Sequence, residues 1–220
     1  MVIRSAPLRG HRPALEGPGF LARPDLQILI DLLREDGRRV IGPTVSDGAI
    51  VFDEISGLDD LPRGIGDEQA PGRYRLRRRN DERLFGFVVG PTAWKKWTFP
   101  ALVPLTRASK DGHKVSFAPQ APDTSPVAFL GARACDIAAL GVQDTVFTGT
   151  AFVDPDYAAR RARIFIVAVQ CTNAASTCFC TSMGTGPEVE DGHDILLTEL
   201  DAGFLIEADT PMVWRGPMVT

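Results

Sequence analysis

The clearest feature of the chain is a pair of apolar runs with amphipathic sequence between them. Ile164–Val169 is a continuous run rich in β-branched residues, which is typical of a strand buried on both faces. Val127–Leu130 is a shorter run, and helical patterns follow it at Cys135–Val142 and Asp154–Arg163. Strand, helix and strand in this order predict a right-handed βαβ unit whose two strands are parallel.

Further elements flank this unit on both sides. Apolar residues recur at helical spacing from Leu26 to Leu33, directly after Pro24 and Asp25, and predict a helix that faces the core. Short strands are predicted at Arg39–Gly42, Ala49–Phe52, Asp194–Glu199 and Phe204–Glu207. We therefore expect an α/β fold, with α+β character in its first half, in which a mixed sheet contains the βαβ unit.

The middle of the chain is less regular. Residues 57–73 are rich in Gly, Pro and Asp and predict a loop. Strands at Arg73–Leu76 and Leu84–Val89 would flank a polar, basic tip at Arg77–Arg83. This tip is either a solvated hairpin end or a docking patch for an acidic partner or a phosphate-bearing cofactor. Residues 104–126 predict a second loop with one more edge strand.

Two tryptophans, Trp94 and Trp97, lie three positions apart with Lys95 and Lys96 between them. This spacing places both indoles on one face of a short helical turn. Either the indoles fill the core while the lysines face water, or they form a binding surface, because tryptophan is favoured at interfaces.

Composition bears on the class of protein and on its domains. With 220 residues, 44% of them hydrophobic and 24% charged, the chain resembles a soluble globular protein that can bury a core without disulfides. We expect a flexible arm over residues 1–23, a single α/β domain over 24–210 and a tail over 211–220. The net charge of −4 argues against nucleic acid as the main partner.

The sequence also bears on location. The first twenty residues contain arginines but no apolar stretch typical of a signal peptide. The longest apolar run, Ile164–Val169, is too short to span a bilayer. We therefore expect a cytoplasmic protein without membrane insertion. In that compartment, clustered cysteines more often bind metals or react than form disulfides.

Four cysteines make up the strongest chemical signal. Cys171, Cys178 and Cys180 lie within ten residues, and Cys135 lies one α/β unit upstream. Cys135 and Cys171 each follow the carboxyl end of a predicted parallel strand, where open α/β sheets bind their ligands. Cys178 and Cys180 lie on the loop after Cys171 and can fold back to the same edge. Four thiols of this kind are a complete ligand set for a tetrahedral metal ion or a cubane cluster.

The surroundings of these cysteines suit an anionic group. Cys135 would begin a helix, whose positive end favours a thiolate or an anionic cluster. Gly184 and Gly186 follow Cys180 in a glycine-rich loop, so their N–H groups can approach cluster sulfurs closely. Such hydrogen bonds would tune a redox potential.

Spacing alone leaves the identity of the metal open. The pattern C-x35-C-x6-C-x-C contains neither the C-x2-C pairs typical of structural zinc nor the C-x2-C-x2-C-x3-C-P run of bacterial ferredoxins. An iron–sulfur cluster, a zinc ion and catalytic or redox thiols all remain as interpretations. The chain contains no G-x-G-x-x-G after a predicted strand and no Ser–His–Asp arrangement, so neither dinucleotide binding nor hydrolase chemistry is indicated.

Five segments together resemble one known group of proteins. Their residues are 61–76 (L-P-R-G-I-G-D-E-Q-A-P-G-R-Y-R-L), 90–100 (G-P-T-A-W-K-K-W-T-F-P), 131–144 (G-A-R-A-C-D-I-A-A-L-G-V-Q-D), 154–161 (D-P-D-Y-A-A-R-R) and 177–187 (T-C-F-C-T-S-M-G-T-G-P). They are similar to the beta subunit of sulfhydrogenases and cytosolic nickel–iron hydrogenases, and to the related A subunit of anaerobic sulfite reductase.

The resemblance implies an electron-transfer subunit. Such a subunit would relay electrons between a flavoprotein partner that oxidises NAD(P)H and a catalytic hydrogenase, sulfur reductase or sulfite reductase subunit. By position, Cys135, Cys171, Cys178 and Cys180 would ligate one 4Fe-4S cluster, and no catalytic residue is implied in this chain. The alternatives are a zinc-stabilised scaffold module and a small flavin-type oxidoreductase.

The chain departs from this group in one respect. Members usually continue into a ferredoxin-like region with two C-x2-C-x2-C-x3-C-P motifs, and these 220 residues contain neither. We therefore expect that region either in a partner subunit or in a second half of the protein that these residues do not include.

Overall fold

The predicted βαβ unit is present at the centre of a large mixed sheet. The computed structural model describes residues 18–90, 92–121 and 123–208. Strands β8 (Val127–Ala132) and β9 (Ile164–Val169) pair in parallel, and helices α3 (Ala134–Phe147) and α4 (Pro155–Arg161) connect them. The prediction of two parallel strands with helices between them is therefore confirmed.

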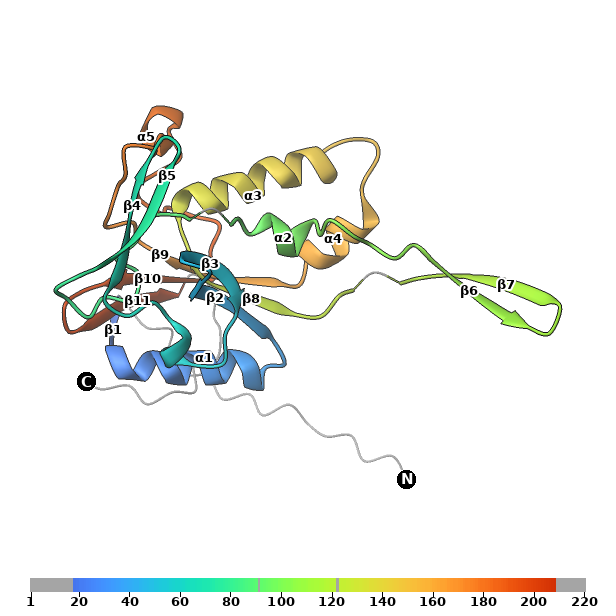
Figure 1. The fold of residues 1–220 in the computed structure, drawn as a ribbon, viewed down its shortest axis with the longest axis horizontal. Helices are drawn as coiled ribbons and strands as arrows, with labels where there is room; N and C mark the ends of the chain where they lie inside the picture. Colours follow the sequence, from blue (N-terminus) through green and yellow to red (C-terminus); the bar gives the residue numbers. More distant parts are fainter. Residues whose placement is uncertain (1–17, 91, 122, 209–220) are drawn as a thin grey trace, which may run out of the picture.

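Five further strands complete this sheet. They are β1 (Gly19–Ala22), β2 (Arg39–Ser46), β3 (Ala49–Glu54), β10 (Ile195–Glu199) and β11 (Gly203–Ala208). The order across the sheet is β1-β11-β10-β9-β8-β2-β3 (Figure 1). Strands β2, β8, β9 and β10 are parallel to one another, whereas β3 and β11 run antiparallel to their neighbours. The fold is thus α/β with a mixed sheet, as predicted.

Helices cover both faces of the sheet (Figure 1). Helix α1 (Leu26–Glu35) lies on one face, and α3 lies on the other together with α4 and the short helix α2 (Lys95–Thr98). Strand β9 contributes to both layers: Val167 and Val169 pack in the core cluster with α1, whereas Ile166 packs in the cluster with Leu140 of α3. This two-sided burial explains why the sequence of β9 is a continuous apolar run.

Helix α1 matches its prediction. A 3-10 turn at Arg23–Asp25 leads into the helix, and Leu26, Leu29, Ile30 and Leu33 are fully buried against the sheet. Gly37 follows the helix with a φ of 79°, a left-handed conformation that glycine adopts without strain.

Two hairpins lie outside the main sheet. One consists of β4 (Ile65–Ala70) and β5 (Arg73–Arg78), and the other of β6 (Thr106–Asp111) and β7 (Lys114–Pro119). The remaining short helices are a 3-10 turn at Leu58–Asp60 and α5 (Cys180–Met183). The β4–β5 hairpin stands beside α5, whereas the β6–β7 hairpin extends away from the sheet (Figure 1).

The structure corrects two predictions in the middle of the chain. Residues 57–73 are not all loop, because Ile65–Ala70 forms β4 and pairs with β5. Leu84–Val89 is not a strand, and its backbone N–H groups are bound instead by side chains, with Glu199 accepting from Leu84 and Phe85 and Asp67 accepting from Val88. Without a neighbouring strand to pair with, apolar residues alone do not make a strand.

Two predictions of loops are also corrected. The region 104–126 contains two paired strands, β6 and β7, where one edge strand was expected. Part of the arm predicted over residues 1–23 belongs to the main sheet, since Gly19–Ala22 pairs with β11. The rest of that arm up to residue 17, and the tail predicted over 211–220, lie outside the described residues.

The core interpretation is confirmed for Trp94. Its indole is 2% exposed and stacks between Phe52 and Phe129, with ring centroids 4.0 and 4.3 Å away. Lys95 and Lys96 are exposed. No helix in the described part of the chain is long and apolar enough to cross a membrane.

Candidate metal centre

The four cysteines lie at or beyond the carboxyl ends of the central strands. Cys135 is the second residue of α3, which follows β8, and Cys171 follows the end of β9 by two residues. Cys180 begins α5, and Cys178 lies just before it in the loop after β9. All four are free thiols, of which Cys178 is exposed and the other three are partly buried.

Three of these thiols converge. Burial, together with the negative charges of Asp136, Cys180 and Cys171, raises the pKa of the Cys135 thiol to about 12. Cys171 and Cys180 lie near the start of α3, because the Arg133 guanidinium donates to the Gln170 carbonyl at 2.8 Å, and a Cβ on Gly186 would lie 3.0 Å from the Ala134 Cβ and 3.5 Å from the Cys180 Sγ. Cys178 contacts its own loop, because its Sγ accepts a hydrogen bond from the Ala175 N–H at 3.3 Å.

The local environment of Cys135 differs from the expectation for a helix N-terminus. The positive end of α3 was expected to favour a thiolate, but burial outweighs it and holds the thiol in its protonated form. A metal that binds there must therefore displace a proton.

A fully buried cation lies beside these thiols. Arg133, between β8 and α3, is 2% exposed, and its guanidinium donates to the carbonyls of Gln170 and Phe85 at 2.8 and 2.6 Å. Burial lowers the pKa of Arg133, whereas the negative charges of Cys171, Asp136, Glu199 and Cys135 act in the opposite direction. Arg133 has no carboxylate within salt-bridge distance among the described residues. Its charge is therefore available to stabilise an anionic group at the thiols.

The loop that carries three of the cysteines is held at its ends and in its middle. The Gln170 side chain donates to the Val189 carbonyl at 3.3 Å and accepts from the Val189 N–H at 3.0 Å, which joins the two ends of the loop. Ser176 and Thr177 donate to the main-chain and side-chain oxygens of Gln69 in β4, at 3.3 and 3.2 Å. The β4–β5 hairpin thus fixes the position of the segment between Cys171 and Cys178.

The two glycines of this loop have different surroundings. Gly186 has a φ of 146°, and a Cβ there would lie 3.0 Å from the Ala134 Cβ and 3.5 Å from the Cys180 Sγ. Gly186 therefore lets the loop pass closely between Cys180 and the start of α3. Gly184 ends α5 in a left-handed conformation in open space, and its N–H donates to the Thr181 carbonyl at 3.2 Å.

A buried carboxylate closes the same edge of the sheet. Glu199, at the end of β10, accepts from the N–H groups of Leu84 and Phe85 at 2.7 and 2.9 Å. Burial raises the pKa of Glu199, although these two hydrogen bonds and the charges of Arg23 and Arg133 oppose the increase. Glu199 therefore holds a segment of the chain over the edge of the sheet. The carbonyls of this same segment bind Arg133.

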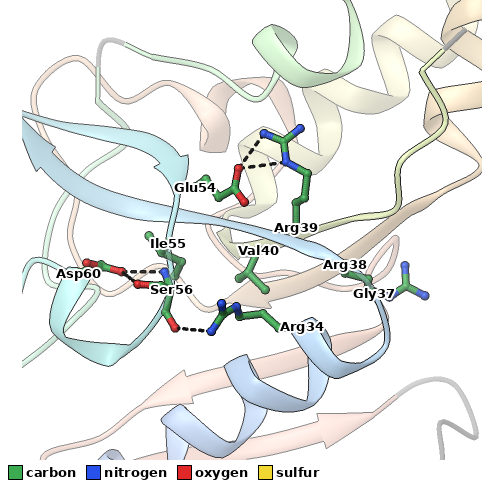
Figure 2. Close-up of a pocket in the computed structure, with 9 residues that line it drawn as sticks. All are labelled: Arg34, Gly37, Arg38, Arg39, Val40, Glu54, Ile55, Ser56 and Asp60. Atoms are coloured by element: carbon green, nitrogen blue, oxygen red, sulfur yellow. Dashed lines mark hydrogen bonds and ion pairs between the residues drawn. The ribbon is translucent and has the colours of Figure 1, made fainter.

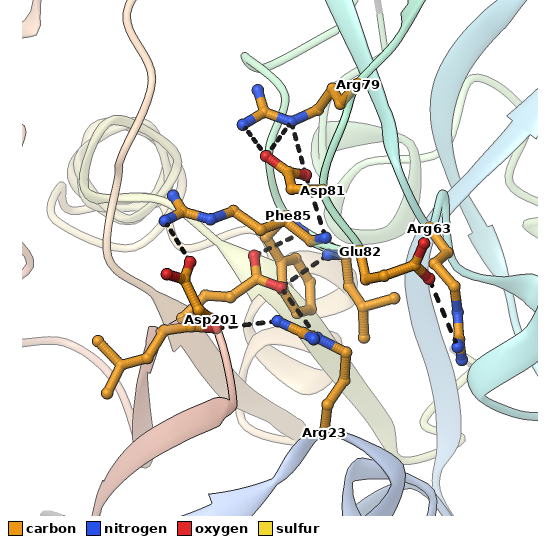
Figure 3. Close-up of polar contacts among 11 residues, drawn as sticks. Arg23, Arg63, Arg79, Asp81, Glu82, Phe85 and Asp201 are labelled. Atoms are coloured by element: carbon orange, nitrogen blue, oxygen red, sulfur yellow. Dashed lines mark hydrogen bonds and ion pairs between the residues drawn. The ribbon is translucent and has the colours of Figure 1, made fainter.

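Ion pairs on the surface reinforce this segment (Figure 3). Arg79 binds Asp81 through two nitrogens and donates to the Gly86 carbonyl at 2.9 Å. Arg63 lies 3.9 Å from Glu82. The residues predicted to form a free basic tip are thus partly engaged in holding the segment in place.

Two hollows lie away from the cysteines. One, of about 440 Å³, lies between the end of α1 and strand β3 (Figure 2). Its arginines are already engaged, because Arg39 binds Glu54 through two nitrogens and Arg34 donates to the Ser56 carbonyl at 3.1 Å. The other, of about 590 Å³, lies at the base of the β6–β7 hairpin.

The described residues hold no group of three or more His, Cys, Asp or Glu side chains placed to bind a single metal ion. Thiolates around a cubane bind four different iron atoms and lie further apart than the ligands of one ion. The absence of such a group among the described residues therefore does not test a cluster.

Sequence reasoning missed the residues that support the cysteines. Arg133, Gln170 and Glu199 each lie at the end of a central strand, and Gln69 lies in a region predicted to be loop. Polar residues at strand ends, one or two positions before a cysteine, are the signal that points to the first two. Nothing local in the sequence connects Glu199 to Leu84 and Phe85.

No family model, curated protein or solved structure matches this chain.

Proposed function

We propose that this protein is an electron-transfer component that carries one 4Fe-4S cluster on Cys135, Cys171, Cys178 and Cys180. The observation that carries the proposal is the placement of Cys135, Cys171 and Cys180 around the start of α3, beside the buried guanidinium of Arg133. Cys178 lies two residues from Cys180 on an exposed loop and supplies the fourth thiol. The resemblance to hydrogenase and sulfite reductase subunits supports the same ligand set.

The residues around the thiols fit an anionic cluster. Four thiolates bring four negative charges to one place, and a buried cation without a carboxylate partner offsets part of that charge. When bound, the cluster would supply one-electron redox chemistry. Arg133 would raise the reduction potential, because its positive charge favours the more negative reduced state.

Other residues orient the ligands and limit access of water. Gln170 and Gln69 hold the cysteine loop at its ends and in its middle, and Gly186 allows it to approach α3. The buried segment that includes Phe85 and Phe87 covers the inner side of the site. Loss of such supporting contacts typically costs about 10–100-fold in metal affinity or activity.

The proposal includes partners and a location. One-electron relay requires a donor and an acceptor, for which we propose a flavoprotein subunit and a hydrogenase or reductase subunit. Four free thiols suit a reducing compartment such as the cytoplasm.

The test is anaerobic purification of the full chain, followed by assays of iron, acid-labile sulfide and zinc. The proposal predicts a brown protein that dithionite bleaches, with about four iron and four sulfide per chain. Cys→Ser variants at each of the four positions should lose most of this iron. A colourless protein with about one zinc would overturn the proposal in favour of a scaffold. A metal-free yellow protein would overturn it in favour of a flavin enzyme.

A further inference from the structure

The β6–β7 hairpin, which we call the arm, projects from the body of the molecule (Figure 1). All twelve of its strand residues, Thr106–Asp111 and Lys114–Pro119, are exposed. Its two strands pair with each other and pack substantially against no other described element. An isolated two-stranded hairpin is marginally stable in water. The arm therefore lacks the packing that stabilises every other strand of the described chain.

The arm is amphipathic. Residues opposite each other in an antiparallel pair share a face, so Phe117 lies with Ala108, and Val115 lies with Lys110. The other face is polar, and there the Ser109 and Ser116 hydroxyls hydrogen-bond at 2.7 Å. Phe117 is 73% exposed and Val115 is 51% exposed. One face thus presents apolar side chains to water.

Further apolar side chains are exposed at the base of the arm. Leu105 is 71% exposed and Leu102 is 87% exposed, and Leu102 lines the hollow of about 590 Å³ at the base of the arm. Exposed apolar side chains that gather on one part of a surface mark interaction sites.

The charges of the arm identify the kind of partner. Arg107, Lys110 and Lys114 outnumber the single acidic residue Asp111. A complementary surface would combine an apolar groove with Asp and Glu around its rim.

A second copy of this chain does not offer such a surface in the hollow at the base of its arm. The hollow at the base of the arm is lined by Arg39, Lys96 and Arg160 against Asp123, and Glu54 and Asp53 already pair with Arg39 and Lys96, so it has no surplus of carboxylates to complement the arm. Two arms packed face to face would likewise bring their positive charges together. Like charges across an interface oppose association.

We propose that the arm docks a different protein chain by inserting its Phe117 face into an apolar groove rimmed by carboxylates. This proposal does not depend on the cluster, because the arm extends away from the cysteines (Figure 1).

The test places a photo-crosslinking amino acid at position 117 of the full chain in cells of its source organism. A matched variant carries it at Ser109, on the polar face of the same arm. Crosslinking from 117 to an apolar segment of another chain flanked by Asp or Glu, with loss of the product when the label is moved to 109, supports the proposal. Products that join two copies of this chain, products equal from both positions, or no product from 117 would overturn it.

Charge reversal gives an independent test. Lys110→Glu together with Lys114→Glu should lower the rate of crosslinking from position 117 by about tenfold at low salt, because steering by opposite charges is lost. The unfolding temperature of the chain should stay the same, since neither side chain contacts the body. Unchanged crosslinking in the folded variant would contradict the acidic rim.

Discussion

At the scale of single residues, two buried side chains of opposite charge organise the edge of the sheet. The Arg133 guanidinium binds carbonyls of the 85–87 segment, and the Glu199 carboxylate binds N–H groups at the start of the same segment. Removing one partner from buried polar contacts costs more than the contacts contribute, because the other partner stays buried without hydrogen bonds. Each side chain is therefore expected to be sensitive to substitution.

Glu199→Gln tests the role of the carboxylate. The amide offers one oxygen to two N–H donors and turns its own N–H toward one of them. We expect a loss of about 2 kcal/mol in the free energy of unfolding, measured by urea denaturation. A loss within experimental error would show that Leu84 and Phe85 do not depend on Glu199.

The pH dependence of the same variant provides a second prediction. Burial raises the pKa of Glu199 above its usual value of 4.5, so the folded protein binds this proton more tightly than the unfolded chain. The contribution of Glu199 to stability is therefore greatest below pH 4.5 and falls as the pH rises through the raised pKa. Glutamine does not titrate, so the stability difference between wild type and Glu199→Gln should shrink with rising pH. A difference that grows with pH would mean that the carboxylate is stabilised in its ionised form.

Gly186→Ala tests the close approach of the cysteine loop to α3. A side chain at a φ of 146° is strained, and its Cβ would press on Ala134 at 3.0 Å. We expect a loss of about 2 kcal/mol in the free energy of unfolding, together with faster loss of iron to a chelator. Gly184→Asn is the matched control, since asparagine tolerates the left-handed conformation and the site is open. Equal effects of the two substitutions would contradict the role given to Gly186.

At the scale of elements, the β4–β5 hairpin links the cysteine loop to a basic surface. Arg73, Arg75 and Arg77 are exposed and alternate along β5, so they share one face, and Glu68 on β4 lies opposite Arg75. The other face carries Gln69, which binds the cysteine loop. The basic patch predicted around Arg77–Arg83 is thus better described as a row of arginines on β5, close to the proposed cluster.

Charge reversal of these three arginines tests whether the row is the docking surface of an acidic electron donor. With Arg73, Arg75 and Arg77 changed to Glu, the rate of reduction by an acidic flavodoxin should fall about tenfold or more at low salt. The difference should disappear at high salt, where such attraction is screened. Reversal of Arg107, Lys110 and Lys114 on the arm makes the same change in net charge and should have little effect. If the rate of reduction falls equally in both triple variants, the rate depends only on net charge, and the row on β5 is not a specific docking surface.

The elements also show which parts of the fold the sequence could predict. Strand β9 was predicted over its full length, because burial on both faces leaves a continuous apolar run. Strand β4 was missed because its inward-facing residues are polar. Asp67 and Gln69 point toward the body of the molecule and bind the 88–89 segment. The false strand at 84–89 has buried apolar residues whose backbone is held by distant side chains. The local pattern of apolar residues indicates which residues are buried. It does not indicate which groups form hydrogen bonds with their backbone.

At the scale of the whole molecule, the topology of the sheet creates the site. Parallel pairing of β8, β9 and β10 brings the ends of three strands to one edge, and each end carries a residue of the site. The sequence order of strand, helix and strand was sufficient to predict that Cys135 and Cys171 follow the carboxyl ends of neighbouring parallel strands. It was not sufficient to predict Glu199 or the 84–87 segment, because both reach the edge through long-range contacts.

The measurement that tests the central claim most directly is a Mössbauer spectrum of the full chain reconstituted anaerobically with ⁵⁷Fe and sulfide. The proposal predicts mixed-valence iron of a cubane at about four iron per chain. This signal should be lost in the Cys135→Ser variant. Iron bound only as single ions, or a cubane signal that persists without Cys135, would contradict the assignment of the cluster to this edge of the sheet.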